Sequence, residues 1–337
     1  MSDTDAAITP DDDAERTRLA LRQVMTAEGL NMTQVGKLSG IAYGTLSAWV
    51  GGTYQGRSDR VASQVQRWMD AHKSKAATRA TVPNAPPFQM TASAEAFKGV
   101  FAHAQHMVDF GVISGGPGVG KTITARDYRE RTPNVWMITA EPCFSTPRSM
   151  LDDLAEKLGV TERSSTGQRV SREIVRKLSN SGGLLIVDEA QHLSTVTLDQ
   201  LRTIHDLASV GIVLIGNEAV YSRVEGTART PAYAQLYSRV GVRLQRPRPQ
   251  KRDVDVLLDA WGIAEMPVRR LLHTIASKPG ALRTLTKCLR MGFMLAAAEA
   301  AGEAGDGQPH AGEVKPTDGH VLMAYRHLAN VELQEAA

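Results

Sequence analysis

The sequence predicts an α/β fold in which a parallel sheet is flanked by helices, with all-helical segments before and after it. Short apolar runs alternate with helix-like segments through the middle of the chain, a pattern typical of parallel sheets. A glycine-rich loop follows the first run, and two carboxylates follow a later one. Ligands of open α/β sheets bind at the carboxyl ends of the strands, so a ligand site is predicted there. The runs predicted as strands are Phe110–Ser114, Val135–Thr139, Leu184–Val187 and Ile212–Ile215.

Changes in composition divide the 337 residues into segments, and this length suits two or three domains. A stretch with three prolines separates a first helical region from the α/β region, and a stretch rich in Gly, Ala and Glu interrupts the last helical region. The expected order is a disordered acidic tail at 1–13, a helical domain at 14–72, a linker at 73–90, an α/β core at 91–252 and a helical domain at 253–337 with a mobile insert at 301–316.

Cysteine content and hydropathy predict a cytoplasmic protein. Cys143 and Cys288 fit no metal-ligand spacing and suit a reduced compartment. No run of 18 apolar residues predicts a membrane span, and the acidic N-terminus does not resemble a signal peptide. The net charge of +3 says little about nucleic acid, but the stretch 239–252 carries six cationic residues and no acid.

A complete phosphate-binding loop is the most specific motif, because residues 115–122 match G-x-x-x-x-G-K-[ST] without a mismatch. It lies between the first predicted strand and a helix-like segment at 123–131. Glycines let backbone N–H groups turn toward phosphates, and the helix dipole favours their charge. The terminal Lys and Thr of such a loop reach the β- and γ-phosphates and Mg²⁺ respectively. The predicted ATP-binding residues of the loop are Gly115, Gly116, Pro117, Gly118, Val119, Gly120, Lys121 and Thr122.

Asp188 and Glu189 follow the apolar run at 184–187 and predict the second half of the site. Asp188 is expected to bind ATP and to hold Mg²⁺ with Thr122, and Glu189 to polarise the attacking water. Nucleotide binding alone does not require the second acid, so the pair favours hydrolysis. The alternative is a helix N-terminus at which the dipole favours acids.

The first helical domain predicts a helix-turn-helix over residues 33–52. Thr33 is the expected N-cap of its first helix, Gly36 allows close helix crossing, and Gly40 makes the turn. The recognition helix is expected at 42–50, with Ile41, Leu46 and Trp49 in the core.

Few side chains of this recognition helix could read bases, so a helical interaction domain that does not touch DNA is the alternative. If the domain binds DNA, cationic and polar residues on and around the helix are the expected contacts. They are Lys37, Tyr43, Thr45, Ser47, Arg57 and Arg60.

Two further polar positions follow the nucleotide motifs. Asn217 lies two residues after the predicted strand at 212–215, where a residue could orient water beside the γ-phosphate. Arg283 begins a helix after Pro279-Gly280 and could point back toward the nucleotide. Each residue alone is weak evidence for a catalytic role, because Asn is common in turns and Arg is common on solvated helix faces.

In this order, the motifs resemble those of the AAA+ ATPases and, more narrowly, of the Mu B family of phage transposition proteins. The resemblance covers about 14–333 and is carried by the stretches 54–68, 115–129, 134–139, 188–193, 220–222 and 278–283. It implies ATP-dependent assembly of the chain with itself into filaments on double-stranded DNA with little sequence preference. It also implies delivery of target DNA to a DDE transposase in a bacterial host, and Mg²⁺-dependent hydrolysis stimulated by DNA and transposase.

The resemblance gives roles to matching residues. Asn217 corresponds to the sensor 1 position and Arg283 to sensor 2, so both join Glu189 in the predicted catalytic set. A neighbouring subunit should supply an arginine finger, for which Arg239 is the first choice and Arg229 the alternative. The insert at 301–316 departs from the family pattern.

Two other functions remain open at this point. A helicase loader shares the ATPase motifs, but such loaders need no helix-turn-helix. A helix-turn-helix transcription regulator with an ATPase switch would bind one operator sequence, whereas the family resemblance implies uniform coating of DNA.

Overall fold

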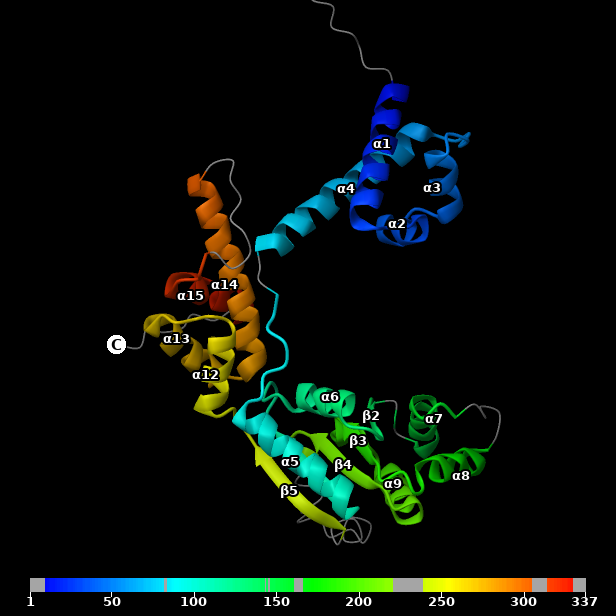
Figure 1. Ribbon diagram of the computed structural model, residues 1–337, viewed down its shortest axis with the longest axis vertical. Helices are drawn as coiled ribbons and strands as arrows, with labels where there is room; N and C mark the ends of the chain where they lie inside the picture. The colour runs from blue at the N-terminus through cyan, green and yellow to red at the C-terminus, as the bar shows by residue number, and fades with distance from the viewer. Residues whose placement is uncertain are drawn as a thin grey trace, which may run out of the picture. The chain divides into compact units, whose positions relative to one another are not determined.

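The computed structural model describes residues 10–81, 84–142, 144, 146–160, 166–220, 239–304 and 314–329. The chain separates after Pro83 into two compact units, which are considered individually (Figure 1). No helix in the described ranges is both long enough and apolar enough to span a membrane.

The N-terminal unit consists of four helices around a small core. They are α1 (Pro10–Glu28), α2 (Met32–Ser39), α3 (Tyr43–Val50) and α4 (Ser58–Thr81). Ile41, Leu46 and Trp49 are buried in its core, as predicted. Gly40 ends α2 with a φ of 70°, and a Cβ on Gly36 would lie 3.1 Å from the Ile41 carbonyl oxygen. The two short helices therefore meet around a glycine turn, in the way the sequence indicates.

Three boundaries in this unit differ from the predictions. The N-cap of α2 is Asn31 and not Thr33, because Asn31 and Gln34 exchange side chain–backbone hydrogen bonds of 2.8 Å in a capping box. Helix α1 begins at Pro10, inside the predicted acidic tail, in agreement with the preference of proline for the first turn of a helix. Helix α4 continues through residues 73–81 of the predicted linker, which are rich in the good helix formers Ala and Lys.

The core of the second unit is a five-stranded parallel sheet in the order β2-β3-β4-β1-β5. Its strands are β1 (Phe110–Gly115), β2 (Val135–Thr139), β3 (Leu184–Asp188), β4 (Gly211–Gly216) and β5 (Val240–Arg246). The four predicted strands are confirmed. Strand β5 was not predicted, because it lies at the sheet edge and its cationic residues indicated only a basic segment.

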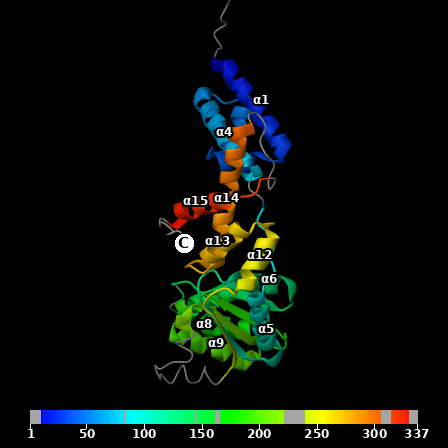
Figure 2. The same cartoon turned by 90° about the vertical axis from the view of Figure 1, so that its left-hand side faces the viewer.

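Helices cover both faces of this sheet (Figure 1 and Figure 2). Helices α5 (Ala92–Met107) and α6 (Lys121–Arg131) pack on one face through Phe97, Phe101 and Tyr128. The other face is covered by α7 (Pro147–Lys157), α8 (Gly167–Leu178) and α9 (Thr195–Ala208). The 3-10 turn η1 (Ala190–His192) follows β3. The predicted α/β class with helices flanking a parallel sheet is therefore confirmed.

The C-terminal helices form their own core. They are α12 (Lys251–Ala260), α13 (Met266–Ala276), α14 (Ala281–Ala304) and α15 (Asp318–Ala329). The fully buried Asp253 connects them to the sheet domain, because its carboxylate accepts hydrogen bonds from Ser93 N (2.9 Å), Ser93 Oγ (2.5 Å) and Gln250 N (2.7 Å). Of the predicted insert at 301–316, the first residues continue α14, and 305–313 lie outside the described residues.

Candidate nucleotide site

The phosphate-binding loop joins the carboxyl end of β1 to the N-terminus of α6, as the motif requires. Gly118 and Gly120 have φ angles of 80° and 94°, a region that side chains disfavour. Gly120 is the N-cap of α6, and no side chain caps this helix. The loop therefore presents a helix N-terminus and glycine backbone toward an anion.

Lys121 lies where the charges of the predicted site converge. Its Nζ donates hydrogen bonds to the carbonyl oxygens of Gly115 (2.8 Å) and Gly116 (2.9 Å). Burial lowers the pKa of Lys121, whereas the nearby carboxylates of Asp188 and Glu189 raise it and Arg283 lowers it. The acidic pair at the end of β3 and Arg283 of α14, which lie far apart in the sequence, thus act electrostatically on one ammonium group.

Thr122 and Asp188, the two residues predicted to hold Mg²⁺, are in direct contact. Thr122 Oγ1 donates a hydrogen bond to Asp188 Oδ2 over 2.7 Å. Burial raises the pKa of Asp188, and the hydrogen bonds from Thr122 and from the Glu189 N–H oppose that rise. A hydroxyl and a carboxylate at this spacing are oxygen donors of the kind that Mg²⁺ prefers. The residues therefore fit Mg²⁺ held between the loop and the end of β3.

Glu189 follows Asp188 directly and is exposed at the carboxyl edge of the sheet. Its φ of 53° is in the left-handed region, and its carbonyl oxygen accepts the His192 N–H over 3.0 Å. The side chain accepts a hydrogen bond from Gln191 Nε2 at 2.5 Å. Gln191 was not among the predicted site residues. The motif that ends in Asp188 and Glu189 does not require a glutamine two residues after the glutamate, so nothing in the sequence indicated this hydrogen bond.

Asn217 lies directly after β4, beside the residues that follow β3. Its N–H donates to Gln191 Oε1 over 3.3 Å, and its own Oδ1 accepts the Ala219 N–H over 2.9 Å. The structure therefore brings Asn217 close to Glu189 through Gln191, at the edge that carries the phosphate-binding loop.

Arg283 belongs to the first turn of α14, which packs on the phosphate-binding loop. Leu282 N donates to Gly118 O over 3.1 Å, and a Cβ on Gly118 would lie 2.8 Å from the Gly280 carbonyl carbon. Arg283 is exposed there and acts electrostatically on Lys121. The C-terminal helices thus contribute a cation to the site.

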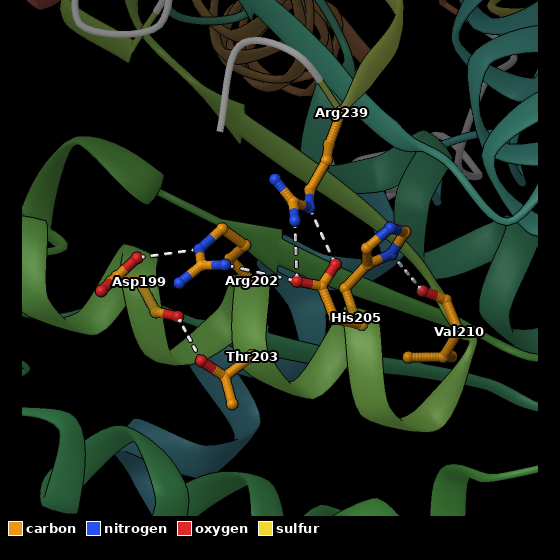
Figure 3. Close-up of polar contacts among 7 residues, drawn as sticks. Asp199, Arg202, Thr203, His205, Val210 and Arg239 are labelled. Atoms are coloured by element: carbon orange, nitrogen blue, oxygen red, sulfur yellow. Dashed lines mark hydrogen bonds and ion pairs between the residues drawn. The ribbon is translucent and has the colours of Figure 1, made fainter. Parts of the chain in front are cut away.

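Arg239 lies elsewhere, at the amino end of β5 (Figure 3). Its carbonyl oxygen accepts the Phe110 N–H at the start of β1. Its guanidinium forms a bidentate ion pair with Asp206 of α9, with distances of 2.8 and 2.9 Å. Strand β5 separates Arg239 from the loop of its own chain by about 20 Å, at a rise of roughly 3.3 Å per residue. The alternative finger Arg229 lies outside the described residues.

The predicted DNA contacts all belong to the N-terminal unit. Lys37, Arg57 and Arg60 are exposed, and Arg57 pairs with Asp59 at 3.1 Å. Tyr43 is 56% exposed, whereas Thr45 and Ser47 on the same helix are half-buried. Helix α3, the predicted recognition helix, thus exposes few polar side chains.

Comparison with known proteins places this architecture in a family. Residues 106–224 match the AAA domain, and residues 238–306 match the C-terminal domain of the Mu B transposition protein. The chain is 36% identical over 279 residues to the ATP-dependent target DNA activator B of Escherichia phage Mu, covering 83% of this chain and 88% of that protein. The chain belongs to the Mu B family of transposition proteins.

A second relative supports this assignment to the Mu B family. The Mu-like prophage FluMu DNA transposition protein B of Haemophilus influenzae is 30% identical over 79% of this chain and 93% of its own length. Among solved structures, NtrX from Brucella abortus in complex with ATP is 17% identical with a TM-score of 0.45, over 86% of this chain and 67% of that chain. That structural similarity is too low to add to the assignment. This Mu B family chain is an AAA+ ATPase.

Proposed function

We propose that this chain is an ATP-dependent target-DNA activator of a phage-type transposition system. In this proposal it assembles as a filament on double-stranded DNA with little sequence preference, and it delivers that DNA to a DDE transposase in the cytoplasm of a bacterial host. The observation that carries the proposal is the 36% identity to a relative named as such an activator, over 83% of the chain. The arrangement of the nucleotide site supports its dependence on ATP.

Within this proposal, the loop glycines and Lys121 bind the phosphates of ATP, and Thr122 and Asp188 hold Mg²⁺. When bound, Mg²⁺ supplies positive charge that offsets the charge on the phosphate oxygens. Glu189 accepts a hydrogen bond from the attacking water and so polarises it. Asn217 orients the same water from the end of the neighbouring strand. Arg283 adds positive charge from the C-terminal helices, so hydrolysis can be coupled to their position.

Arg239 acts in a neighbouring subunit in this proposal. Its distance of about 20 Å from the loop of its own chain, estimated from the strand rise, excludes direct action in cis without rearrangement. An arginine supplied in trans stabilises charge that develops on the transferred phosphoryl group. Assembly would then require Arg239 to exchange the Asp206 carboxylate for a phosphate, and hydrolysis would depend on filament contacts.

The decisive experiment is a strand-transfer assay with a DDE transposase of the phage-type transposition system to which this chain is proposed to belong. Target DNA, donor ends and transposase are combined with or without the chain, and with ATP or ADP. The proposal expects transfer into target DNA to rise only with both the chain and ATP. Equal transfer without the chain would reject the role in target activation.

The glycine turn between α2 and α3 favours one second candidate, a transcription regulator that reads an operator. That function expects protection of one short DNA sequence by the N-terminal unit. Uniform protection along unrelated DNA is the result expected of the target activator.

A further inference from the structure

A chain of hydrogen bonds crosses the carboxyl edge of the sheet, from the phosphate-binding loop to the end of β4. It starts at Thr122 Oγ1, which donates to Asp188, whose other carboxylate oxygen accepts the Glu189 N–H over 3.0 Å. Gln191 then donates to the Glu189 side chain at 2.5 Å and accepts the Asn217 N–H over 3.3 Å. Within this series of hydrogen bonds, Gln191 is the residue that connects the end of β3 to the end of β4.

Both functional atoms of the Gln191 amide are used inside the site. Nε2 is a donor and meets a carboxylate, and Oε1 is an acceptor and meets a backbone N–H. A hydrogen bond to a carboxylate is stronger than one between neutral groups, so the contact restricts the rotamers of Glu189. The two contacts together fix the spacing between Glu189 and the start of the segment that carries Asn217.

The neighbouring backbone leaves room for this amide. A Cβ on Gly216 would lie 2.6 Å from Gln191 Oε1, closer than such contacts occur. Gly216 is the last residue of β4, so the end of this strand is shaped to receive the Gln191 side chain. Glu189 itself is exposed, so the surrounding fold does not enclose its side chain.

We propose that Gln191 is a positioning residue for ATP hydrolysis, which orients the Glu189 carboxylate and holds it at a fixed distance from Asn217. This inference rests on the proposed function only for the catalytic role of Glu189. A misplaced general base lowers the rate of the chemical step without changing how tightly the ground state binds. Gln191 therefore affects kcat and leaves ATP affinity unchanged.

The test compares variants of the full-length protein. Gln191→Met keeps the length of the side chain and removes both hydrogen bonds, and Gln191→Glu keeps an acceptor for Asn217 but replaces the donor toward Glu189 with a second carboxylate. Gln200→Met is the matched control, because Gln200 Nε2 donates over 3.1 Å to Ser171 Oγ between α9 and α8, away from the site. ATP affinity is measured by titration with a fluorescent ATP analogue, and kcat by phosphate release.

We expect Gln191→Met to lower kcat about tenfold, with ATP affinity within about twofold of the original, since a displacement of a catalytic group by about 1 Å can cost on the order of 10²-fold. Gln191→Glu should lower kcat at least as much, and Gln200→Met should have no effect. Unchanged kcat in Gln191→Met, or a loss of ATP affinity at unchanged kcat, would overturn the inference. If Gln191→Met does not fold, unchanged kcat in Gln191→Glu overturns it.

A double variant tests whether Gln191 acts through Glu189. If it does, Gln191→Met adds no further loss of kcat to Glu189→Gln, because the residues act as one unit. Independent losses that multiply would assign Gln191 a separate role and contradict the inference. Normal hydrolysis by Glu189→Gln alone would instead reject the role of Glu189 in the proposed function, so the two failures are distinguishable.

Discussion

Lys121 and Glu189 serve different steps, and substitutions should separate them. Lys121 is the cation of the loop, so Lys121→Ala removes the positive partner of the phosphates and should weaken ATP binding by about 100-fold or more, given a loss of roughly 3 kcal/mol for a charged hydrogen bond. Glu189→Gln keeps a side chain of the same shape that cannot act as a base, and should bind ATP normally but hydrolyse it only at a residual rate, about 10²- to 10⁴-fold lower. Fluorescent-ATP titration and phosphate release measure both properties. Normal turnover in Glu189→Gln would contradict its assigned role.

Asp127 is the residue whose charge should matter most for stability within α6. Its side chain is 8% exposed and accepts hydrogen bonds from Lys98 Nζ (2.6 Å) and Arg131 Nε (2.8 Å). Burial alone would raise the pKa of Asp127, but the two hydrogen bonds outweigh it and hold the pKa below its usual value of 3.8. The ionised form therefore stabilises the fold above the usual pKa, and this stability is lost as the pH falls through the lower folded-state pKa.

Asp127→Asn should thus lower the free energy of unfolding by about 2 kcal/mol at neutral pH, the typical size for hydrogen bonds to charged groups. The difference from the original protein should shrink as the pH falls below about 4, the usual carboxylate pKa. Urea unfolding at a series of pH values measures it. Asp152→Asn, which breaks an exposed pair with Arg148, is the control and should cost less than about 1 kcal/mol. A pH-independent difference for Asp127→Asn would contradict the ionic explanation.

At the scale of elements, the contact between the phosphate-binding loop and α14 should decide whether Arg283 reaches the site. Gly118→Ala places a methyl group against the Gly280 carbonyl and should move the start of α14 away from the loop. Gly159→Ala is a matched control, because Gly159 also has a positive φ, of 69°, but its Cβ would meet nothing within 4 Å. We expect ATPase activity to fall more than about tenfold in Gly118→Ala only, since small displacements of catalytic groups cost up to 10²-fold. A similar loss of ATPase activity in both variants would mean that backbone strain, and not the contact with α14, causes the loss. Unchanged activity in Gly118→Ala would mean that this contact does not matter for hydrolysis.

The elements of the sheet could be predicted to the extent that burial dictated their composition. Strands β1, β3 and β4 are buried throughout, and their continuous apolar runs were recognisable. Among the described strands, β5 pairs only with β1 and is partly exposed. Its arginines interrupt the apolar pattern, so the segment was not recognised as a strand. The N-cap at Asn31 was missed because Thr33 fits the same signal, and only the capping box with Gln34 decides between them.

The candidate site was predictable where a motif fixes both residue type and spacing. The loop at 115–122 and the pair Asp188–Glu189 met at the sheet edge as expected, because parallel strands end on one side. Gln191 and Asp206 were not predicted, since their roles depend on which side chains the fold brings beside them. Sequence spacing carries no information about the long-range contacts of Gln191 with Asn217 and of Asp206 with Arg239.

At the scale of the whole molecule, catalysis across subunits predicts complementation between two inactive variants. Arg239→Ala should lower stimulated ATPase activity strongly, up to roughly a thousandfold at the chemical step, because arginine fingers contribute that much. Mixing it with Lys121→Ala should restore part of the activity, because one type of interface then keeps both an intact loop and an arginine. The readout is phosphate release at varied ratios of the two variants. Full ATPase activity of Arg239→Ala alone would exclude Arg239 as the arginine finger and transfer that role to Arg229.

We expect ATP, and not DNA sequence, to govern DNA binding by this chain. Fluorescence anisotropy with several labelled duplexes of unrelated sequence tests it most directly, in ATP, in ADP and without nucleotide, at two salt concentrations. We predict binding at least about tenfold tighter with ATP than with ADP, similar affinity for all duplexes, and a steep loss of affinity with salt as phosphate contacts release counterions. Tight binding to one sequence that is unchanged by removal of ATP would contradict it.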